Sequence, residues 1–336
     1  MSTQPRPLIQ APGWKAQLRD AVRDGEALLA MLGLSADQVG LSKEAARDFP
    51  LLAPRDFVRR IRHGDPRDPL LRQVLAVGDE LVDVAGFGAD PTGETEGAIA
   101  RTGILHKYAG RVLLIVAGGC AVNCRYCFRR HFPYGDNVIS RRAWGDALGY
   151  VSGDTSITEV ILSGGDPLIA DDRALAELCD RIAAIGHVRR IRIHTRLPVV
   201  IPDRVTDALL DAVTPAGVQT VFVVHSNHAN ELDDVVGQAF ARIRARGLVL
   251  LNQAVLLAGV NDDADTLAEL NEALFAHGAL PYYLHVLDRV RGAAHFDLDE
   301  ARALELHGAL RDRLPGYLVP KLVREEAGAP AKTPLG

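Results

Sequence analysis

The chain has 336 residues, of which 48% are hydrophobic and 24% charged, and its formal net charge is -5. This is the composition of an ordinary globular protein with a sizeable core, and the net negative charge argues against a nucleic-acid-binding protein that works through bulk positive charge. No apolar run reaches the roughly 18 residues that span a bilayer, and the start of the chain lacks the apolar stretch of a secretory signal, so we expect a cytoplasmic protein with no membrane partner.

The first hundred residues are predicted to be helical. Apolar residues at helical spacing favour one amphipathic face formed by Trp14, Leu18, Val22, Leu28, Leu29 and Leu32. A second helix is expected over 56–63, before the turn-forming sequence GDPRDP. The Gly-rich, acidic segment 86–98 (GFGADPTGETEGA) is interpreted as a linker.

From Arg111 onward, apolar strands alternate with amphipathic helices. Strands are predicted at 111–117, 159–163, 190–195, 220–225, 248–257 and 282–287. Between them we expect helices that include 172–185, ended by Gly186, and 264–277, closed by Gly278. Six such repeats imply an α/β protein with a parallel sheet, either curled into a barrel or doubly wound.

Polar residues follow several of these strands at the point where each strand ends. They lie at 163–166, 194–196, 225–227 and 252–253 and at Asp288. In parallel α/β sheets the functional residues gather beyond the carboxyl ends of the strands. A functional site is therefore expected at this edge of the sheet.

Three of the four cysteines, Cys120, Cys124 and Cys127, lie within eight residues directly after the first predicted strand. A disulfide framework would be spread through a small secreted chain, so ligation of a metal or cluster is the better interpretation. Three thiolates can hold three irons of a four-iron cluster and leave the fourth iron open to a small molecule. The alternatives are a Cys3His zinc site with His131, or unliganded thiols; Cys179 is interpreted as a core residue.

The spacing Cys-x3-Cys-x2-Cys after the first strand of a β/α repeat resembles the radical S-adenosylmethionine (SAM) superfamily. The resemblance implies a partial (β/α)6 barrel, a [4Fe-4S] cluster and SAM. The sequence SGGDP, which follows the next strand, is similar to the glycine-rich element that contacts the methionine amino group in that superfamily. By this resemblance Ser163, Gly164, Gly165 and Asp166 are cofactor-binding residues.

Further motifs narrow the resemblance to the lysine 2,3-aminomutase family. They are CRYCFRRHF, SGGDPL, HSNHANE, LNQAVLLAGVND, PYYLHVLD and the final KTPL, and they run from about Gly103 to the C terminus. The segments GGCAVNCRYCFRRHFPY and VLDRVRGAAHF are most similar to the branch that makes (R)-β-lysine for modification of elongation factor P. The resemblance implies an isomerase that also uses pyridoxal 5'-phosphate (PLP). It divides the chain into a helical region (1–98), a partial barrel (99–315) and a C-terminal segment that carries the PLP lysine (316–336).

Residue roles follow from the resemblance where the motifs match. Lys332 matches the lysine that holds PLP, and Lys107, Tyr108 and Arg111 match the residues that bind its phosphate. Position 107 is usually Arg in the family, so Lys107 keeps the charge but loses the bidentate geometry.

The substrate and SAM contacts are carried over in the same way. Arg129 matches the arginine that pairs with the substrate carboxylate, and Asp288 matches the first carboxylate that binds the distant ammonium of lysine. The second such carboxylate is Glu325 here, where the family has Asp. His225 and Gln253 match residues near SAM.

The resemblance also implies partners. These are L-lysine as substrate, elongation factor P with its lysyl ligase, and an electron donor such as flavodoxin or ferredoxin. Three alternatives stay open on the sequence. The first is an aminomutase that makes β-lysine as a free metabolite, the second is a radical SAM enzyme of another reaction class, and the third is a zinc-stabilised binding module.

Overall fold

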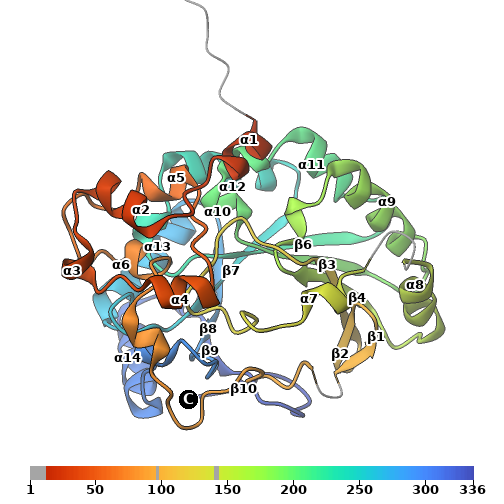
Figure 1. The fold of residues 1–336 in the computed structure, drawn as a ribbon. Helices are drawn as coiled ribbons and strands as arrows, with labels where there is room; N and C mark the ends of the chain where they lie inside the picture. The colour runs from red at the N-terminus through yellow and green to blue at the C-terminus, as the bar shows by residue number, and fades with distance from the viewer. Residues whose placement is uncertain (1–12, 96–97, 140–143) are drawn as a thin grey trace, which may run out of the picture.

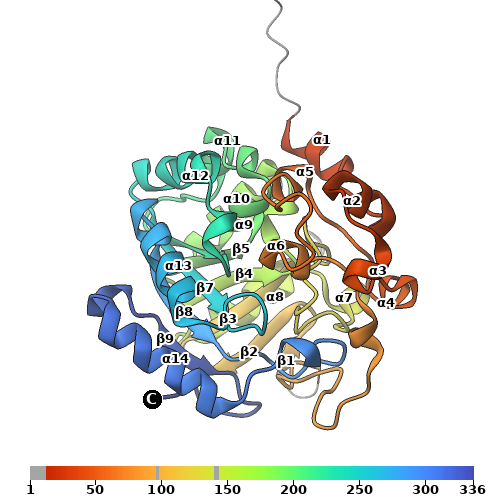
Figure 2. The same ribbon diagram turned by 90° about the vertical axis from the view of Figure 1, so that its left-hand side faces the viewer.

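The computed structural model of the chain describes residues 13–95, 98–139 and 144–336 and contains one curved mixed sheet (Figures 1 and 2). Its strands lie in the order in which they occur along the chain. They are β1 (Ile99–Arg101), β2 (Ile104–Tyr108), β3 (Arg111–Ala117), β4 (Glu159–Gly164), β5 (Arg190–Thr195), β6 (Gln219–His225), β7 (Val249–Val255), β8 (Leu280–His285), β9 (Lys321–Arg324) and β10 (Thr333–Pro334).

Strands β3 to β9 are parallel, whereas β1, β2 and β10 pair antiparallel at the two ends of the sheet. The strand order never reverses, as it does in a doubly wound sheet, so each β–α unit advances the sheet in one direction. The helices between the strands lie on the outer face of the curve (Figure 2). The predicted partial barrel is therefore confirmed, and the doubly wound alternative is excluded.

The helices of the barrel follow the predicted alternation. They are α7 (Tyr134–Asn137), α8 (Trp144–Gly153), α9 (Asp172–Ala183), α10 (Leu197–Val200), α11 (Asp207–Ala212), α12 (Asp234–Ala245), α13 (Ala264–Ala276) and α14 (Glu300–Arg313). Aspartates cap the long ones: Asp171 accepts from the third backbone N–H of α9, and Asp299 does the same for α14. No helix in the described part of the chain has the length and apolar character needed to cross a membrane.

The N-terminal region consists of short helices, shown in red and orange in Figure 1. They are α1 (Trp14–Arg19), α2 (Gly25–Leu32), α3 (Ala36–Val39), α4 (Lys43–Asp48), α5 (Arg55–Val58) and α6 (Pro69–Arg72). The single apolar face expected over residues 14–32 was wrong, because Val22 leaves the helical path to form an antiparallel bridge with Ala53. The helix expected over 56–63 is the single turn α5.

These helices pack against the loop that carries the three cysteines. Within this loop Arg125 is fully buried, and its Nε and Nη2 donate to the Glu80 carboxylate at 2.8 and 2.5 Å. Arg130, from the same loop, donates to Glu80 at 2.9 Å, and Arg125 Nη1 reaches the carbonyl of Phe49 at 2.5 Å. The N-terminal region thus braces the cysteine loop through one buried carboxylate and two arginines.

Replacing this carboxylate is expected to cost stability. Glu80→Gln leaves Arg125 buried without a negative partner and leaves Arg130 only the longer contact to the exposed Asp48 at 3.5 Å, so the free energy of unfolding should fall by about 3 kcal/mol. The matched control is Lys43→Gln, which breaks an exposed ion pair with Glu26 and should change stability little. Urea unfolding of both variants checks the prediction, and equal midpoints for the two would contradict it.

Candidate active site

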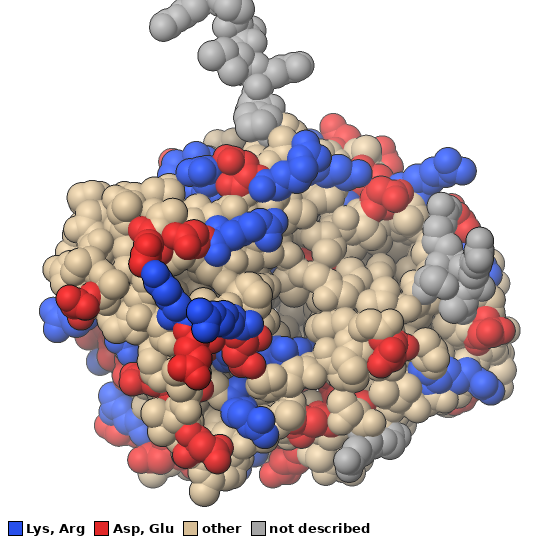
Figure 3. Space-filling model, in the orientation of Figure 1, with Lys and Arg blue, Asp and Glu red and all other residues tan. Residues whose placement is uncertain are grey.

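A large pocket lies at the carboxyl ends of the parallel strands. Its empty volume is about 1680 Å³, with open solvent at its mouth included. The face of the molecule seen in Figure 3 is hollowed near its centre. Every site residue predicted from the sequence lines this pocket: Lys107, Tyr108, Arg111, Cys120, Cys124, Cys127, Arg129, Ser163, Gly164, Gly165, Asp166, His225, Gln253, Asp288, Glu325 and Lys332.

The three cysteines form one wall of the pocket on the loop after β3. None of them is in a disulfide. Burial raises the pKa of the Cys127 thiol to about 11, and the charge of Cys124 adds to this shift; the pKa of Cys120 is raised for the same reasons. Three thiolates this close would repel one another unless a cation lay between them. The donor set therefore fits a cluster held by three cysteines.

The structure does not bring His131 to the three cysteines, as a Cys3His zinc site would require. His131 does not line the pocket, and its Nε2 lies 3.3 Å from the carbonyl oxygen of Arg291. Among the described residues no group of three or more His, Cys, Asp or Glu side chains converges on one point, as the ligands of a single metal ion such as zinc do. The three cysteine ligands of a four-iron cluster each bind a different iron, so they need not converge in this way. His131 therefore offers no fourth ligand to the thiols.

Arg196 places a positive charge beside the cysteine loop. Its Nη1 donates to Cys124 Sγ at 2.7 Å, and its Nη2 donates to Gln73 at 2.7 Å and to Glu231 at 2.9 Å. Glu231 is fully buried, so its pKa, which burial alone would raise, is lowered by Arg196. Arg196 follows β5, and its contact with Cys124 could not be inferred from its position in the sequence.

The glycines at the end of β4, Gly164 and Gly165, allow the chain there to touch the cysteine loop. Gly165 donates its N–H to the carbonyl of Ala117 at 2.7 Å, and a Cβ at this position would lie 2.1 Å from the carbonyl oxygen of Gly119. Gly164 has φ +110°, which side chains rarely tolerate. The end of β4, which carries Ser163, and the turn after it therefore lie directly against the start of the cysteine loop.

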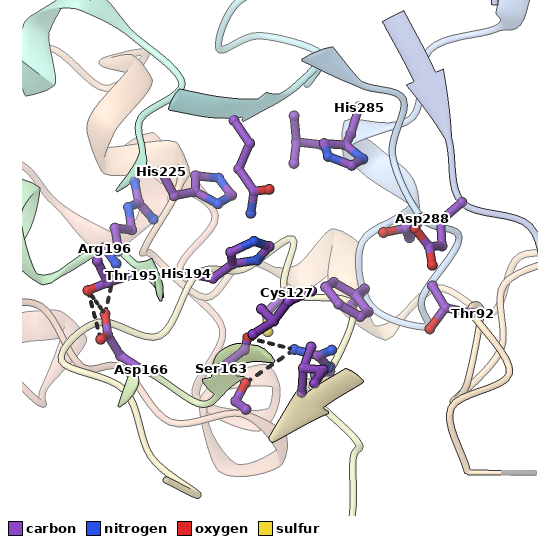
Figure 4. A pocket seen from close by; sticks show the side chains of 18 of the residues that line it. Thr92, Cys127, Ser163, Asp166, His194, Thr195, Arg196, His225, His285 and Asp288 are labelled. Atoms are coloured by element: carbon purple, nitrogen blue, oxygen red, sulfur yellow. Dashed lines mark hydrogen bonds between the residues drawn. The ribbon is translucent and has the colours of Figure 1, made fainter. Parts of the chain in front are cut away.

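Asp166 lines the pocket, but its carboxylate is used within the protein. It accepts from Thr195 Oγ1 at 2.8 and 2.9 Å and from the backbone N–H groups of Arg196, Leu197 and Leu168 at 2.7, 3.1 and 3.0 Å. Figure 4 shows these side chains grouped on one side of the pocket. Asp166 thus fixes the turn that carries Arg196.

Lys332 lies at the opposite side of the pocket in a network centred on Glu325. Glu325 accepts from Lys332 Nζ at 2.5 Å, from Lys107 Nζ at 2.6 Å and from the Tyr108 hydroxyl. Burial alone would raise the pKa of Glu325, but Lys332 and Lys107 lower it to about 2. The Arg111 guanidinium lies over the Tyr108 ring at 4.9 Å. An amine surrounded by these cations fits a phosphorylated aldehyde such as PLP.

Asp288 differs from the other acids of the pocket. Burial raises its pKa to about 7, and no hydrogen bond to a described residue offsets this shift. In Figure 4 its side chain stands on the far side of the pocket from Asp166 and Arg196. Its carboxylate is therefore available to an incoming cation.

Arg129 is paired within the protein. Its Nε and Nη2 donate to the two carboxylate oxygens of Glu94 at 2.6 and 2.9 Å. Glu94 and Thr92 belong to the segment predicted to be a linker, yet both are buried and line the pocket. No sequence signal distinguished Glu94 from the other acids nearby.

Three histidines at strand ends line the pocket in the neutral form. Burial lowers the pKa of His225 to about 3 and also lowers the pKa values of His194 and His285. The Nε2 atom of His194 is buried without a hydrogen-bond partner among the described residues. His194 belongs to the polar group 194–196 expected at this edge, but neither it nor His285 was assigned a role from the sequence, because their burial depends on the curvature of the sheet.

Comparison with known proteins places the chain among relatives of similar length. Residues 114–270 match the model of the Radical SAM superfamily. The chain is 50% identical to the L-lysine 2,3-aminomutase of Escherichia coli K12 over 323 residues. This aligned region covers 96% of this chain and 94% of that protein. The L-lysine 2,3-aminomutases of Haemophilus influenzae and Buchnera aphidicola are 48% and 39% identical, each over 95% of this chain and 94% of theirs.

The contact between the two loops predicts that Gly165 tolerates no side chain. In Gly165→Ala the Cβ would force the Gly119 backbone away, so the protein should lose about 1–3 kcal/mol of stability and bind less iron after anaerobic reconstitution. The control is Gly149→Ala within α8, where a Cβ meets nothing and should stabilise the helix slightly. Thermal unfolding and iron content check both variants; wild-type values for Gly165→Ala would refute the packing argument.

Proposed function

Since the chain belongs to the lysine 2,3-aminomutase family of radical SAM enzymes and is an isomerase, we propose that it converts L-α-lysine into (R)-β-lysine with PLP as a further cofactor. One observation carries the proposal. The cysteine loop after β3 and Lys332 near the C terminus line the same cavity, although 212 positions separate Cys120 from Lys332. A cluster and a PLP group could therefore act on one substrate.

The cofactors supply the difficult chemistry. Bound together, a [4Fe-4S] cluster, SAM and PLP provide a carbon radical that can remove hydrogen from an unactivated C–H bond, and a ring system that stabilises the migrating amino group. Cys120, Cys124 and Cys127 would hold the cluster, and Ser163, Gly164 and Gly165 would face the methionine part of SAM. Neutral His225 and Gln253, which line the same pocket, would lie near SAM.

The other pole of the cavity would bind PLP. Lys332 would hold the cofactor covalently, while Lys107, Tyr108 and Arg111 would bind the phosphate, because they gather positive charge and a hydroxyl donor in one corner. The ammonium of Lys332 donates to Glu325 in the free protein. With PLP attached, the Lys332 nitrogen would no longer donate to Glu325. The Glu325 oxygen that Lys332 contacts, Oε2, would then be left without a partner.

The ends of lysine would be fixed by opposite charges. Arg129 would bind the α-carboxylate, and Asp288, together with the released oxygen of Glu325, would bind the ε-ammonium. Holding both ends restricts the chain of the substrate so that its C2 and C3 atoms face the reacting groups. The buried walls of the pocket would exclude water from the reactive species.

The product is proposed to serve the modification of elongation factor P through its lysyl ligase, with flavodoxin or ferredoxin as electron donor. Support comes from the segments GGCAVNCRYCFRRHFPY and VLDRVRGAAHF, which resemble that branch. The alternative is that β-lysine is released as a free metabolite. Incubation of the purified product with the elongation factor P ligase distinguishes the two roles, because only the first requires the ligase to use it.

The activity is tested on reconstituted protein without oxygen. With SAM, PLP, dithionite and L-lysine, the wild-type enzyme should form β-lysine, which chiral chromatography identifies. Lys332→Ala should lose both the visible absorbance of bound PLP and the product, yet keep its iron and sulfide. Formation of no β-lysine by wild-type protein with verified cluster and PLP would contradict the proposal.

The raised pKa of Asp288 predicts a pH dependence of lysine binding. Asp288 binds an ammonium only when ionised, and its pKa is about 7. Below that pH lysine must displace a proton, so KM for lysine should rise several-fold from pH 8 to pH 6. Asp288→Asn should weaken lysine binding and flatten this part of the profile. If KM for lysine rose as steeply from pH 8 to pH 6 in Asp288→Asn as in the wild type, the titrating group would be a residue other than Asp288.

A further inference from the structure

The Arg129 guanidinium and the Glu94 carboxylate form a closed, buried ion pair at the edge of the pocket. The Arg129 side chain is 10% exposed and that of Glu94 5%. Burial alone would lower the pKa of Arg129, but Glu94 raises it, so the guanidinium stays charged. The pair could mean either of two things: Glu94 competes for the place of the substrate carboxylate, or it orients the guanidinium that binds it.

The donor geometry distinguishes these possibilities. A guanidinium has five N–H donors in a rigid plane. Glu94 takes one from Nε and one from Nη2, which form one edge of the plane. Nη1 makes long contacts to Ser163 Oγ at 3.3 Å and to the Gly164 carbonyl at 3.4 Å, on the other side. Of the five N–H groups, one on Nη2 has no partner among these contacts, and the two on Nη1 have only the long ones. A second carboxylate at the outer fork, between Nη1 and Nη2, would therefore compete with no short hydrogen bond.

The backbone around Glu94 is held independently of Arg129. The Asp90 carboxylate accepts from the N–H of Glu94 at 2.9 Å and from the N–H of Thr95 at 2.7 Å. Lys107 Nζ donates to the carbonyl of Thr92 at 3.1 Å. These hydrogen bonds hold the backbone at Thr92, Glu94 and Thr95, and none of them involves Arg129.

Displacement of Glu94 would also be costly. Lys107 Nζ is 3.9 Å from its carboxylate, but the direct partner is Arg129. If a substrate replaced it, Glu94 would remain as a buried charge with its main partner lost. If the substrate carboxylate binds the outer fork while Glu94 keeps the Nε/Nη2 edge, Arg129 holds both carboxylates and Glu94 does not lose its partner.

We propose that Glu94 is a positioning residue: it holds one edge of Arg129 so that the outer fork faces the pocket and selects substrates with an α-carboxylate. This inference rests on the proposed function, in which Arg129 binds the carboxylate of lysine. It assigns the segment before β1, rather than the barrel alone, a part in substrate specificity. Glu94 acts through Arg129 and touches no reacting atom.

The test compares two ligands that differ in the carboxylate. L-lysine and cadaverine share the five-carbon chain and a terminal ammonium, but cadaverine lacks the carboxylate. Both are titrated by calorimetry into the enzyme loaded with cluster and PLP, without reductant. Glu94→Gln should bind lysine at least about tenfold more weakly and cadaverine within about twofold of wild type.

A matched variant separates positioning from general stability. Asp172→Asn removes the acidic partner of Arg204, a fully buried arginine that does not line the pocket. It should leave the binding of both ligands unchanged. If Glu94→Gln fails to fold, Glu94→Asp replaces it; the shorter carboxylate cannot reach both nitrogens and should give a smaller loss of lysine binding only.

The outcomes are distinct. Tighter lysine binding by Glu94→Gln would show that Glu94 competes with the substrate, and unchanged binding would show that it does not orient Arg129. Equal loss of both ligands would show that it only supports the pocket. Each of these overturns the inference while leaving the proposed function standing. A wild-type enzyme that binds lysine and cadaverine equally would overturn the assignment of Arg129 and the inference together.

Discussion

Six parallel strands, β3 to β8, end at one rim of the curved sheet, and this common direction is the constraint on which the site depends. Residues placed after different strands must face the same cavity, however far apart they lie in the sequence. β9 continues the parallel order, and β10 folds back on it, which brings Lys332 to the same rim. The cysteine loop is fixed from the other direction by the N-terminal helices through Glu80 and Arg125.

Charge is distributed in the cavity so that most buried groups already have partners. Glu231 neutralises Arg196 beside the cysteines, Glu94 neutralises Arg129, and Glu325 neutralises Lys332. Such pairing avoids the cost of isolated buried charge. Asp288 is the exception among the acids described above, and its raised pKa marks it as a group awaiting a cation. The site is thus prepared for a substrate with an ammonium at one end and a carboxylate at the other.

The sequence predicted the parallel sheet because buried parallel strands are continuous apolar runs. The choice of a partial barrel over a doubly wound sheet came from the resemblance to the radical SAM superfamily. The sequence predicted the cysteines from their spacing and Lys332 from the motif around it. It did not predict β1, β2, β9 or β10, which are short strands at the two ends of the sheet. Nor did it predict Glu94, because an acidic residue in a Gly-rich segment gains a role only when the fold places Arg129 beside it. Nor did it predict that the Asp166 carboxylate anchors the turn at Thr195 and Arg196, a contact that depends on the packing of β4 against β5.

The central claim is that one cavity brings SAM and a PLP-bound amino acid together. It is tested most directly with L-lysine that carries deuterium at C3. After anaerobic turnover, SAM is recovered and analysed by mass spectrometry. The account predicts that deuterium appears in the adenosyl part of the recovered SAM. If β-lysine formed while the recovered SAM contained no deuterium, hydrogen would not pass between the two sites, and the shared cavity would not be the reaction centre.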